Sequence, residues 1–454
     1  MIDARARDLL TPLPDVLRIV DRLERHGYET WIVGGAVRDA LLGRPPTEWD
    51  LATAAPPEVV RRLFRRTVPV GLRHGTVGVL GRDGVLYEVT TFRRDLATDG
   101  RHAEVAFTRS LDEDLARRDF TINALAWHPL RQELRDPFGG QDDLQRRRLR
   151  TVGEPGQRFA EDYLRILRAF RFAGRYELDV DPTTWAALVA AVPQLPRLSA
   201  ERVREELVKT MATVPRPSRA LELYARSGAL AVLYPELHAT VGLADGFGAD
   251  VWTHQLRVVD ALPPRPLLRI VGLLHDVGKA RTPPPDFPGH AEVGAALARD
   301  LLRRLRCSNA EVDRATHLIA QHTSLPPLDA SDAELRFLLR RLGPTFVTDF
   351  WRLRIAICRA TPALGHQGAQ LLQLWRRLRR VQQARPPLRV TDLAIDGRDL
   401  RALGLPPGPA YGAILQALLD RVTEDPARNR PEVLRALARA EAERLGAISP
   451  SDGG

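Results

Sequence analysis

Short apolar segments separated by glycine turns dominate the chain from about residue 28 to 135. The segments TWIVGG, WDLAT, GTVGVL and VLYEVTTF are rich in β-branched residues, which favours strands. Between them, stretches such as APPEVVRRLFRR carry apolar residues at helical spacing. This alternation predicts an α+β N-terminal head with a mixed sheet and helices.

The pattern changes after about residue 155, where strand-like segments disappear. The stretches RFAEDYLRILRAFRFAGRY, SAERVREELVKTMA and SRALELYARSGALAVL repeat apolar residues at i, i+3, i+4 and i+7, which predicts helices. Proline-rich segments such as TPPPDFPG predict loops between later helices. We therefore predict four parts, namely a head at 1–150, a helical neck at 151–245, a helical body at 246–383 and a helical tail at 384–454.

Composition and charge narrow the class of protein. No apolar run in the 454 residues approaches the ~20 residues of a membrane span. The first residues, MIDARARDLLTPLP, lack the apolar core of an export signal, and two cysteines are too few for a disulfide framework. We expect a cytoplasmic protein with no membrane partner. A net charge of +10 predicts a polyanionic partner, although genome composition is an alternative reason for choosing arginine over lysine.

A pair of glycines, Gly34 and Gly35, separates an apolar strand from a helical run in IVGGAVRDALLG. Glycines at such a junction let backbone N–H groups approach a phosphate closely, and the start of the helix adds partial positive charge. The pair therefore predicts a phosphate-binding turn. A plain structural turn is the alternative.

Three carboxylates follow this turn and suggest a metal site. Glu48 and Asp50 are two residues apart in a strand-like segment, so strand periodicity places both on one face. Glu88 lies within a later apolar strand, where a carboxylate is costly unless it is paired or bound to metal. Hard divalent ions such as Mg²⁺ relieve this repulsion, and two of them can support phosphoryl or nucleotidyl transfer. A solvated acidic edge, with Glu88 on an exposed strand face, is the alternative.

A second pair, Asp162 and Arg165, is spaced i, i+3 in a predicted helix, so both side chains can point into one cleft. Cytosine and adenine each present an amine donor beside an unprotonated ring nitrogen. A carboxylate accepts from the amine and a guanidinium donates to the ring nitrogen. Uracil and guanine reverse this pattern and would leave buried charges unpaired. The pair can therefore select C and A, unless it is an ordinary surface ion pair.

The order and spacing of these motifs resemble the tRNA nucleotidyltransferase and poly(A) polymerase family of the bacterial and eukaryotic class. The resemblance spans about residues 30–210 and rests on six motifs: IVGGAVRD, E-W-D followed by LAT, EVTTFRRD, DLARRDFTINALA, EDYLRILRAFRFA and LSAERVREEL. It implies a nucleotidyltransferase head whose acids, Glu48, Asp50 and Glu88, bind two Mg²⁺ ions, with Glu48 and Asp50 as the catalytic pair. The family usually has Asp where this chain has Glu48.

The same resemblance implies roles for the residues around these acids. It implies that the incoming nucleotide is bound by Gly34, Gly35, Arg38, Arg118, Asp119, Asn123, Asp162 and Arg165. The polar segment between Thr91 and Leu111 predicts a mobile loop. In the family such a loop lets the site change from C to A addition, so its presence favours CCA or A addition over CC addition.

Histidines and an aspartate recur on later predicted helices. His254, His275 with Asp276, His290 and His322 form a ligand set typical of a transition-metal site. The block LLHDVGK resembles the HD phosphohydrolases, which implies a metal that hydrolyses phosphoesters. That pattern ends in an aspartate, and here LRIAICRATPALG has Thr361 in its place, while Asp349 is off register. We therefore hypothesise a weakened metal site with little or no phosphohydrolase activity.

These motifs together predict a tRNA nucleotidyltransferase that adds CCA from CTP and ATP, with tRNA as its partner. An A-adding or CC-adding enzyme shares the same chemistry and is the nearest alternative, followed by a poly(A) polymerase. An HD phosphohydrolase with a degenerate head, or a non-catalytic RNA-binding protein, represents a different class. Thr361 argues against the first of these, and the intact head motifs argue against the second.

Overall fold

The computed structural model of the chain describes residues 3–98, 103–246, 249–405 and 408–445. Contacts within the chain define two compact units. One comprises Met1–His238 with Arg304–Arg306, and the other comprises Ala239–Arg303 with Cys307–Gly454. The division into head, neck, body and tail stays a prediction.

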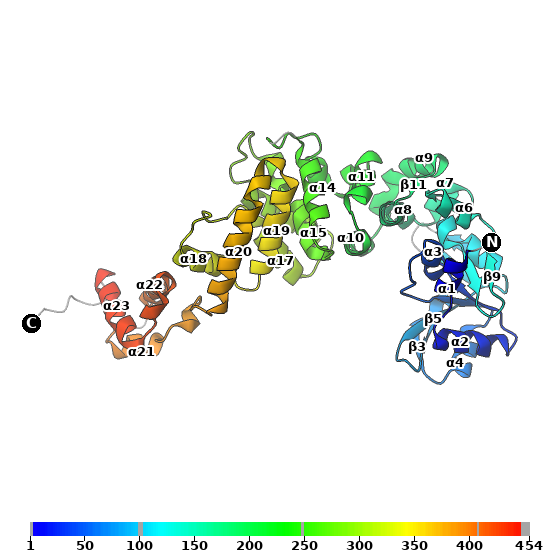
Figure 1. The fold of residues 1–454 in the computed structure, drawn as a ribbon, viewed down its shortest axis with the longest axis horizontal. Coiled ribbons are helices and arrows are strands. Elements are labelled where there is room, and N and C mark those ends of the chain that lie inside the picture. The colour runs from blue at the N-terminus through cyan, green and yellow to red at the C-terminus, as the bar shows by residue number, and fades with distance from the viewer. Residues whose placement is uncertain (1–2, 99–102, 247–248, 406–407, 446–454) are drawn as a thin grey trace, which may run out of the picture. The chain divides into compact units, whose positions relative to one another are not determined.

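The first unit contains a seven-stranded mixed sheet in the order β3-β4-β5-β2-β1-β8-β9 (Figure 1). β2 runs parallel to β5, and the other neighbouring strands are antiparallel. The interior strand β1 is buried along its whole length, as its sequence TWIV predicts. The strands are β1 Thr30–Val33, β2 Leu51–Thr53, β3 Thr67–Gly71, β4 Thr76–Leu80, β5 Leu86–Thr91, β8 Ala126–His128 and β9 Glu133–Arg135. The predicted α+β head with a mixed sheet is confirmed.

The segment between Thr91 and Leu111 differs from its prediction. The described residues on either side of 99–102 form an antiparallel pair, β6 (Arg93–Thr98) and β7 (Ala103–Phe107), with Arg93 opposite Phe107. The expectation of a loop is therefore wrong for these two strands, because the backbone hydrogen bonds of a hairpin are available even to a polar sequence. The tip, at 99–102, lies outside the described residues.

Helices make up the rest of the first unit. The longest stretches of buried side chains are on α8, which packs against α10 and α11. The helices are α1 Ala4–Leu9, α2 Pro14–Glu24, α3 Gly35–Leu41, α4 Pro57–Leu63, α5 Leu111–Ala116, α6 Gly140–Gln145, α7 Pro155–Glu161, α8 Leu164–Tyr176, α9 Pro182–Ala191, α10 Ala200–Thr213, α11 Ser218–Arg226, α12 Ala229–Leu233 and α13 Pro235–His238. Two short strands, β10 Arg148–Leu149 and β11 Asp179–Val180, pair in parallel.

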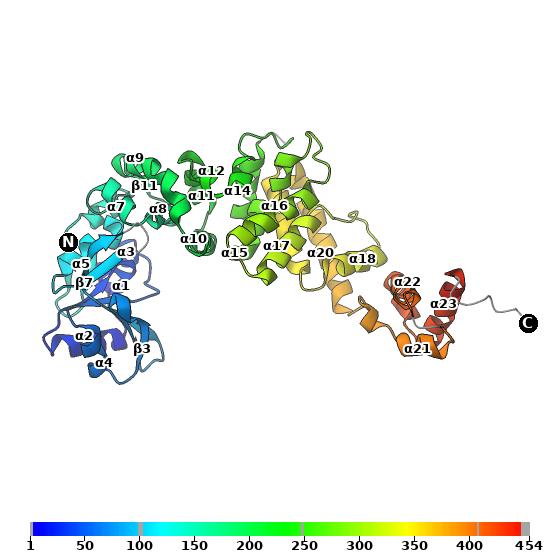
Figure 2. The same ribbon diagram turned by 180° about the vertical axis from the view of Figure 1, so that it is seen from behind.

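The second unit is mostly helical in its described residues, as predicted, with one isolated β-bridge between Ala244 and Asp250. α14 packs against α15 and α19. α15 packs against α17, and the two lie side by side in Figure 2. None of the helices in the described ranges is long and apolar enough to cross a membrane. The helices are α14 Val251–Ala261, α15 Pro266–Leu274, α16 His290–Arg304, α17 Asn309–Gln321, α18 Asp332–Leu342, α19 Val347–Ala360, α20 Gly368–Gln383, α21 Gly397–Ala402, α22 Ala410–Glu424 and α23 Pro431–Arg444.

Candidate functional site

One cleft of about 540 Å³ in the first unit collects the predicted head residues, apart from Glu88. The side chains come from α3, the segment before β2, the turn after α5, and helices α8 and α10. The lining residues are Gly34, Gly35, Arg38, Glu48, Asp50, Arg117, Arg118, Asp119, Asn123, Asp162, Arg165, Arg168, Arg171, Phe172, Arg175 and Lys209. A cleft with this many cations suits a polyanionic ligand.

The sequence interpretation missed Arg168, Arg171, Phe172, Arg175 and Lys209 as part of this site. The signal was present on α8, because residues 165, 168, 172 and 175 are spaced three or four apart and share one helix face. Nothing comparable marks Lys209 on α10 in the sequence.

The turn at Gly34 requires glycine. Its φ is 67°, in a region that other residues rarely adopt, and its N–H donates to the Leu125 carbonyl at 2.9 Å. An added Cβ would lie 2.9 Å from Arg118 Nη1. The missing side chain therefore lets the Arg118 guanidinium lie against the backbone at the edge of the cleft.

The carboxylates Glu48 and Asp50 come immediately before β2 rather than within a strand, so the predicted strand placement is wrong by a few residues. Parallel pairing of Leu51 with Val89 brings Asp50 next to Glu88, which is exposed on β5. Poor hydration in the cleft and the negative charges of Glu88 and Glu48 raise the pKa of Asp50. Mutual repulsion of this kind is what a divalent cation relieves, so the three carboxylates fit a Mg²⁺ site.

Asp119 is buried at the centre of a polar network. The Phe120 N–H and Asn123 Nδ2 each donate to its Oδ1 at 2.9 Å, and Arg168 Nε donates to its Oδ2 at 2.7 Å. Burial would raise the pKa of Asp119, but the Arg168 charge and the Asn123 and Arg168 hydrogen bonds lower it to about 2. The Asn123 side-chain oxygen in turn accepts from Arg38 Nη1. The network fixes three predicted nucleotide-binding side chains relative to one another.

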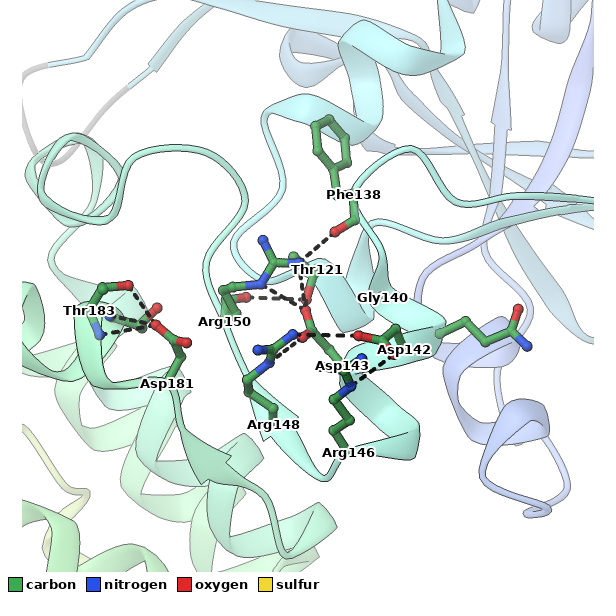
Figure 3. Close-up of polar contacts among 12 residues, drawn as sticks. Thr121, Phe138, Gly140, Asp142, Asp143, Arg146, Arg148, Arg150, Asp181 and Thr183 are labelled. Atoms are coloured by element: carbon green, nitrogen blue, oxygen red, sulfur yellow. Dashed lines mark hydrogen bonds and ion pairs between the residues drawn. The ribbon is translucent and has the colours of Figure 1, made fainter.

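A second network anchors the turn that carries Asn123 (Figure 3). Asp143 on α6 is fully buried, and its Oδ2 accepts from Thr121 Oγ1 at 2.6 Å. Arg148 Nε donates to Oδ1 at 2.6 Å, and Arg150 Nε donates to Oδ2 at 3.1 Å. Thr121 begins the 3-10 turn Thr121–Asn123, so its hydrogen bond to Asp143 holds in place the turn that carries Asn123.

The predicted base-reading pair lies in the cleft but not on one helix. Asp162 follows α7 in an extended conformation, with φ −156°, and Leu164 N–H donates to its Oδ1 at 3.1 Å. Arg165 lies in the first turn of α8. The i, i+3 helix prediction is therefore wrong for Asp162, which lies between the end of α7 and the start of α8.

The two members of the pair contact different partners. Arg165 Nη1 donates to Glu161 Oε2 at 2.6 Å and to the Arg158 carbonyl at 2.8 Å. Asp162 Oδ2 accepts from Arg202 Nη2 at 2.8 Å. None of these three partners was singled out from the sequence.

In the second unit, the predicted histidines surround Asp276. His275 Nε2 lies 3.4 Å and His254 Nε2 3.7 Å from Asp276 Oδ2. His290 Nε2 and His322 Nε2 each lie 3.4 Å from its Oδ1. These groups form two overlapping sets of possible metal ligands among the described residues.

The tautomers of this cluster favour metal binding. The Nδ1 atoms of His275, His290 and His322 lie 2.8, 2.8 and 2.7 Å from backbone carbonyl oxygens. Since a carbonyl can only accept, each Nδ1 carries a proton, so the neutral form of each ring offers its lone pair at Nε2. Burial lowers the pKa of His254 to about 4 and also lowers that of His322, which favours the neutral ring in both. Burial acts in the same direction on His290, but the hydrogen bond and charge of Asp276 outweigh it and raise its pKa. The donor set fits a transition metal.

Thr361 and Asp349 are the two residues to consider for the last acid of the HD pattern. Thr361 is buried at the end of α19. Asp349, the nearby acid, accepts hydrogen bonds from Arg265, Arg314 and Arg352. Those three cations occupy its carboxylate, which leaves Asp349 outside the histidine cluster.

Comparisons with known proteins agree with this geometry. The family model described as the poly A polymerase head domain matches residues 30–150, and a model for a second domain of tRNA nucleotidyltransferases matches residues 290–438. The CCA-adding enzyme of Geobacillus kaustophilus is 35% identical over 436 residues, covering 94% of this chain and 96% of the relative. The CCA-adding enzyme of Geobacillus stearothermophilus is 36% identical over 428 residues, with the same coverage of 94% and 96%.

Solved structures extend the likeness to the whole fold. The Bacillus stearothermophilus CCA-adding enzyme in complex with CTP has a TM-score of 0.73 and 33% identity, covering 96% of this chain and all of that one. The Thermotoga maritima CCA-adding enzyme complexed with tRNA has a TM-score of 0.59 at 19% identity, covering 96% of this chain and 98% of that one, a likeness of fold alone.

Proposed function

The chain belongs to the family of CCA-adding enzymes, which are nucleotidyltransferases, and we propose that it completes the 3′-CCA end of tRNA from CTP and ATP. The observation that carries this proposal is the single cleft that holds both the carboxylates Glu48 and Asp50 and the base-reading residues Asp162 and Arg165. Addition of A alone or CC alone, and poly(A) synthesis, are not favoured, because the relatives matched along the whole chain are CCA-adding enzymes. A tRNA substrate supports a cytoplasmic location.

Glu48, Asp50 and Glu88 would hold two Mg²⁺ ions in the head. The raised pKa of Asp50 supports this assignment, since burial raises it most and the negative charges of Glu88 and Glu48 raise it further. When bound, the ions supply charge stabilisation for the attacking and leaving oxygens of the transfer. In the reaction, the 3′-hydroxyl oxygen of tRNA forms a bond to the α-phosphorus of the nucleotide, and the bond to pyrophosphate breaks.

The residues of the chain bind and select the nucleotide. Gly34, Gly35, Arg38 and Arg118 contact the phosphates, and Asp119, fixed by Asn123 and Arg168, accepts hydrogen bonds from the ribose. Asp162 accepts from the exocyclic amine of C or A, while Arg165 donates to the adjacent ring nitrogen. No nucleic-acid template is needed for this selection.

The proposal is tested with tRNA transcripts that end before, within and after CC. Each is incubated with CTP and ATP, separately and together, and the products are sequenced. We expect CCA ends that stop at A, no product with Asp50→Ala, and normal product with the exposed control Glu58→Ala. Tails of many A residues, incorporation of one nucleotide type only, or a fully active Asp50→Ala variant would overturn the proposal.

The geometry around Asp276 supports a second candidate function in the second unit. We propose that His254, His275, Asp276, His290 and His322 bind a transition metal, with little or no phosphohydrolase activity because Thr361 replaces the last acid. The metal content of protein equilibrated with Ni²⁺ or Mn²⁺ should exceed that of His275→Ala. Equal metal contents in the two proteins would refute the metal site. Hydrolysis of 2′,3′-cyclic phosphates by the wild type, abolished in His275→Ala, would refute the proposed lack of phosphohydrolase activity.

A further inference from the structure

The two base-reading residues are held in place by different means. The Arg165 guanidinium has three acceptors, namely Glu161 Oε2 at 2.6 Å and the carbonyls of Arg158 at 2.8 Å and Arg117 at 3.2 Å. Asp162 lies outside a helix, so no regular backbone geometry fixes its side chain. Its orientation depends on the Leu164 N–H at Oδ1 and on Arg202 Nη2 at Oδ2.

Arg202 lies forty residues further along the chain, in the first turn of α10. Its side chain and that of Asp162 are 29% and 28% exposed, so the ion pair between them is largely shielded from water. Arg202 does not line the cleft. Its hydrogen bond to Asp162 is therefore the direct contact through which Arg202 can act on the nucleotide.

The hydrogen-bond capacity of Asp162 is compatible with this support. A carboxylate offers about four lone-pair positions. The Leu164 N–H and Arg202 use one on each oxygen, which leaves one on each oxygen for the amine of an incoming base. Without Arg202, the carboxylate could rotate about its side-chain bonds, and Arg165 alone would remain in place to distinguish bases.

We propose that Arg202 is a positioning residue for base selection, because it orients the Asp162 carboxylate toward the exocyclic amine of C and A. This inference rests on the proposed function. A fixed acceptor penalises the O4 of uracil and the O6 of guanine, which would face a carboxylate with no hydrogen to share. If the carboxylate can rotate, discrimination against uracil and guanine falls more than the affinity for C and A.

The test measures selectivity rather than activity alone. Single-nucleotide extension of tRNA transcripts gives kcat/KM for CTP, UTP, ATP and GTP with Arg202→Gln and Arg202→Lys. We expect the CTP/UTP and ATP/GTP ratios to fall about tenfold or more in Arg202→Gln, the size of one hydrogen bond to a charged group, and less in Arg202→Lys. The control is Arg219→Gln, which removes an exposed arginine of α11 that does not line the cleft.

A double variant separates positioning from general damage. In an Asp162→Asn background, Arg202→Gln should lower the ratios no further, because its effect passes through Asp162. Equal losses of kcat/KM for all four nucleotides, or a further loss of selectivity in the double variant, would overturn the proposal. If Arg202→Gln fails to fold, Arg202→Lys takes its place in the test. Unchanged nucleotide ratios in Arg202→Lys would then overturn the proposal. Failure of the wild-type chain to add C and A would instead overturn the proposed function.

Discussion

The carboxylate of Asp143 offers a quantitative test of how the site is supported. It is fully buried and accepts from Thr121 Oγ1, Arg148 Nε and Arg150 Nε (Figure 3). In Asp143→Ala, these three donors lose their acceptor. Removing one partner of a buried charged network costs about 3–5 kcal/mol.

The lower end of that range applies here, because the side chains of Arg148 and Arg150 are 32% and 35% exposed and can turn toward water. Thr121 cannot, since it is fully buried and its hydroxyl would keep only a 3.4 Å contact with the Arg150 carbonyl. We therefore expect a loss of about 3 kcal/mol in the unfolding free energy of the first unit. For a unit of this size that loss corresponds to a fall in Tm of roughly 6–12 °C.

Differential scanning calorimetry of the full chain measures this shift. Asp142→Ala is the matched control, because Asp142 is the preceding residue but its side chain is 49% exposed in its contact with Arg146. An exposed i, i+4 pair contributes only about 0.5 kcal/mol, so its Tm should change by about 1–2 °C. Similar Tm values for the two variants would refute the reasoning that burial of Asp143 gives the network its strength.

Three further outcomes are expected. Gly34→Ala should raise KM for CTP and ATP about tenfold, since it adds backbone strain at φ 67° and displaces Arg118. Its control is Gly27→Ala, where φ is 81° but the space around the residue is open, and KM should stay unchanged in the same extension assay. The lowered pKa of Asp119, about 2 against 3.8, means that its stabilising contribution is present above about pH 4 and lost as the pH falls toward 2, so acid unfolding of Asp119→Asn should lack this step. Ni²⁺ at 100 times its Kd should stabilise the second unit by about 2.7 kcal/mol in wild type and not in His322→Ala, as measured by the shift in Tm.

The sequence predicted which residues line the cleft better than it predicted their backbone conformation. The motifs identified Asp162 and Arg165, but their spacing suggested one helix, whereas Asp162 stands before α8. An aspartate ahead of LRILRAF is itself a helix-start signal, so this break could have been predicted. Likewise, Asp99-Gly100 between LAT and AEVAF is a hairpin signal, and β6 and β7 flank it.

Other parts of the site could not be predicted, because they depend on contacts between distant segments. Arg202 reaches Asp162 across forty residues, and no local pattern indicates which of the many arginines does so. The position of Glu88 beside Asp50 follows from the parallel pairing of β2 with β5, which only the sheet order reveals. Sequence patterns report the chemistry of a side chain and its local geometry, whereas its partner is set by tertiary packing.

The two proposed clusters of ligand groups differ in chemistry and favour different ions. The head offers only carboxylate oxygens, which suit a hard ion that exchanges readily, such as Mg²⁺. The cluster around Asp276 offers imidazole nitrogens, and backbone carbonyls hold the rings of His275, His290 and His322; such donors suit a borderline ion held more tightly. Under the proposed function, the metal requirement of nucleotide addition rests on Glu48, Asp50 and Glu88 of the first unit, and the proposed histidine site belongs to the second unit.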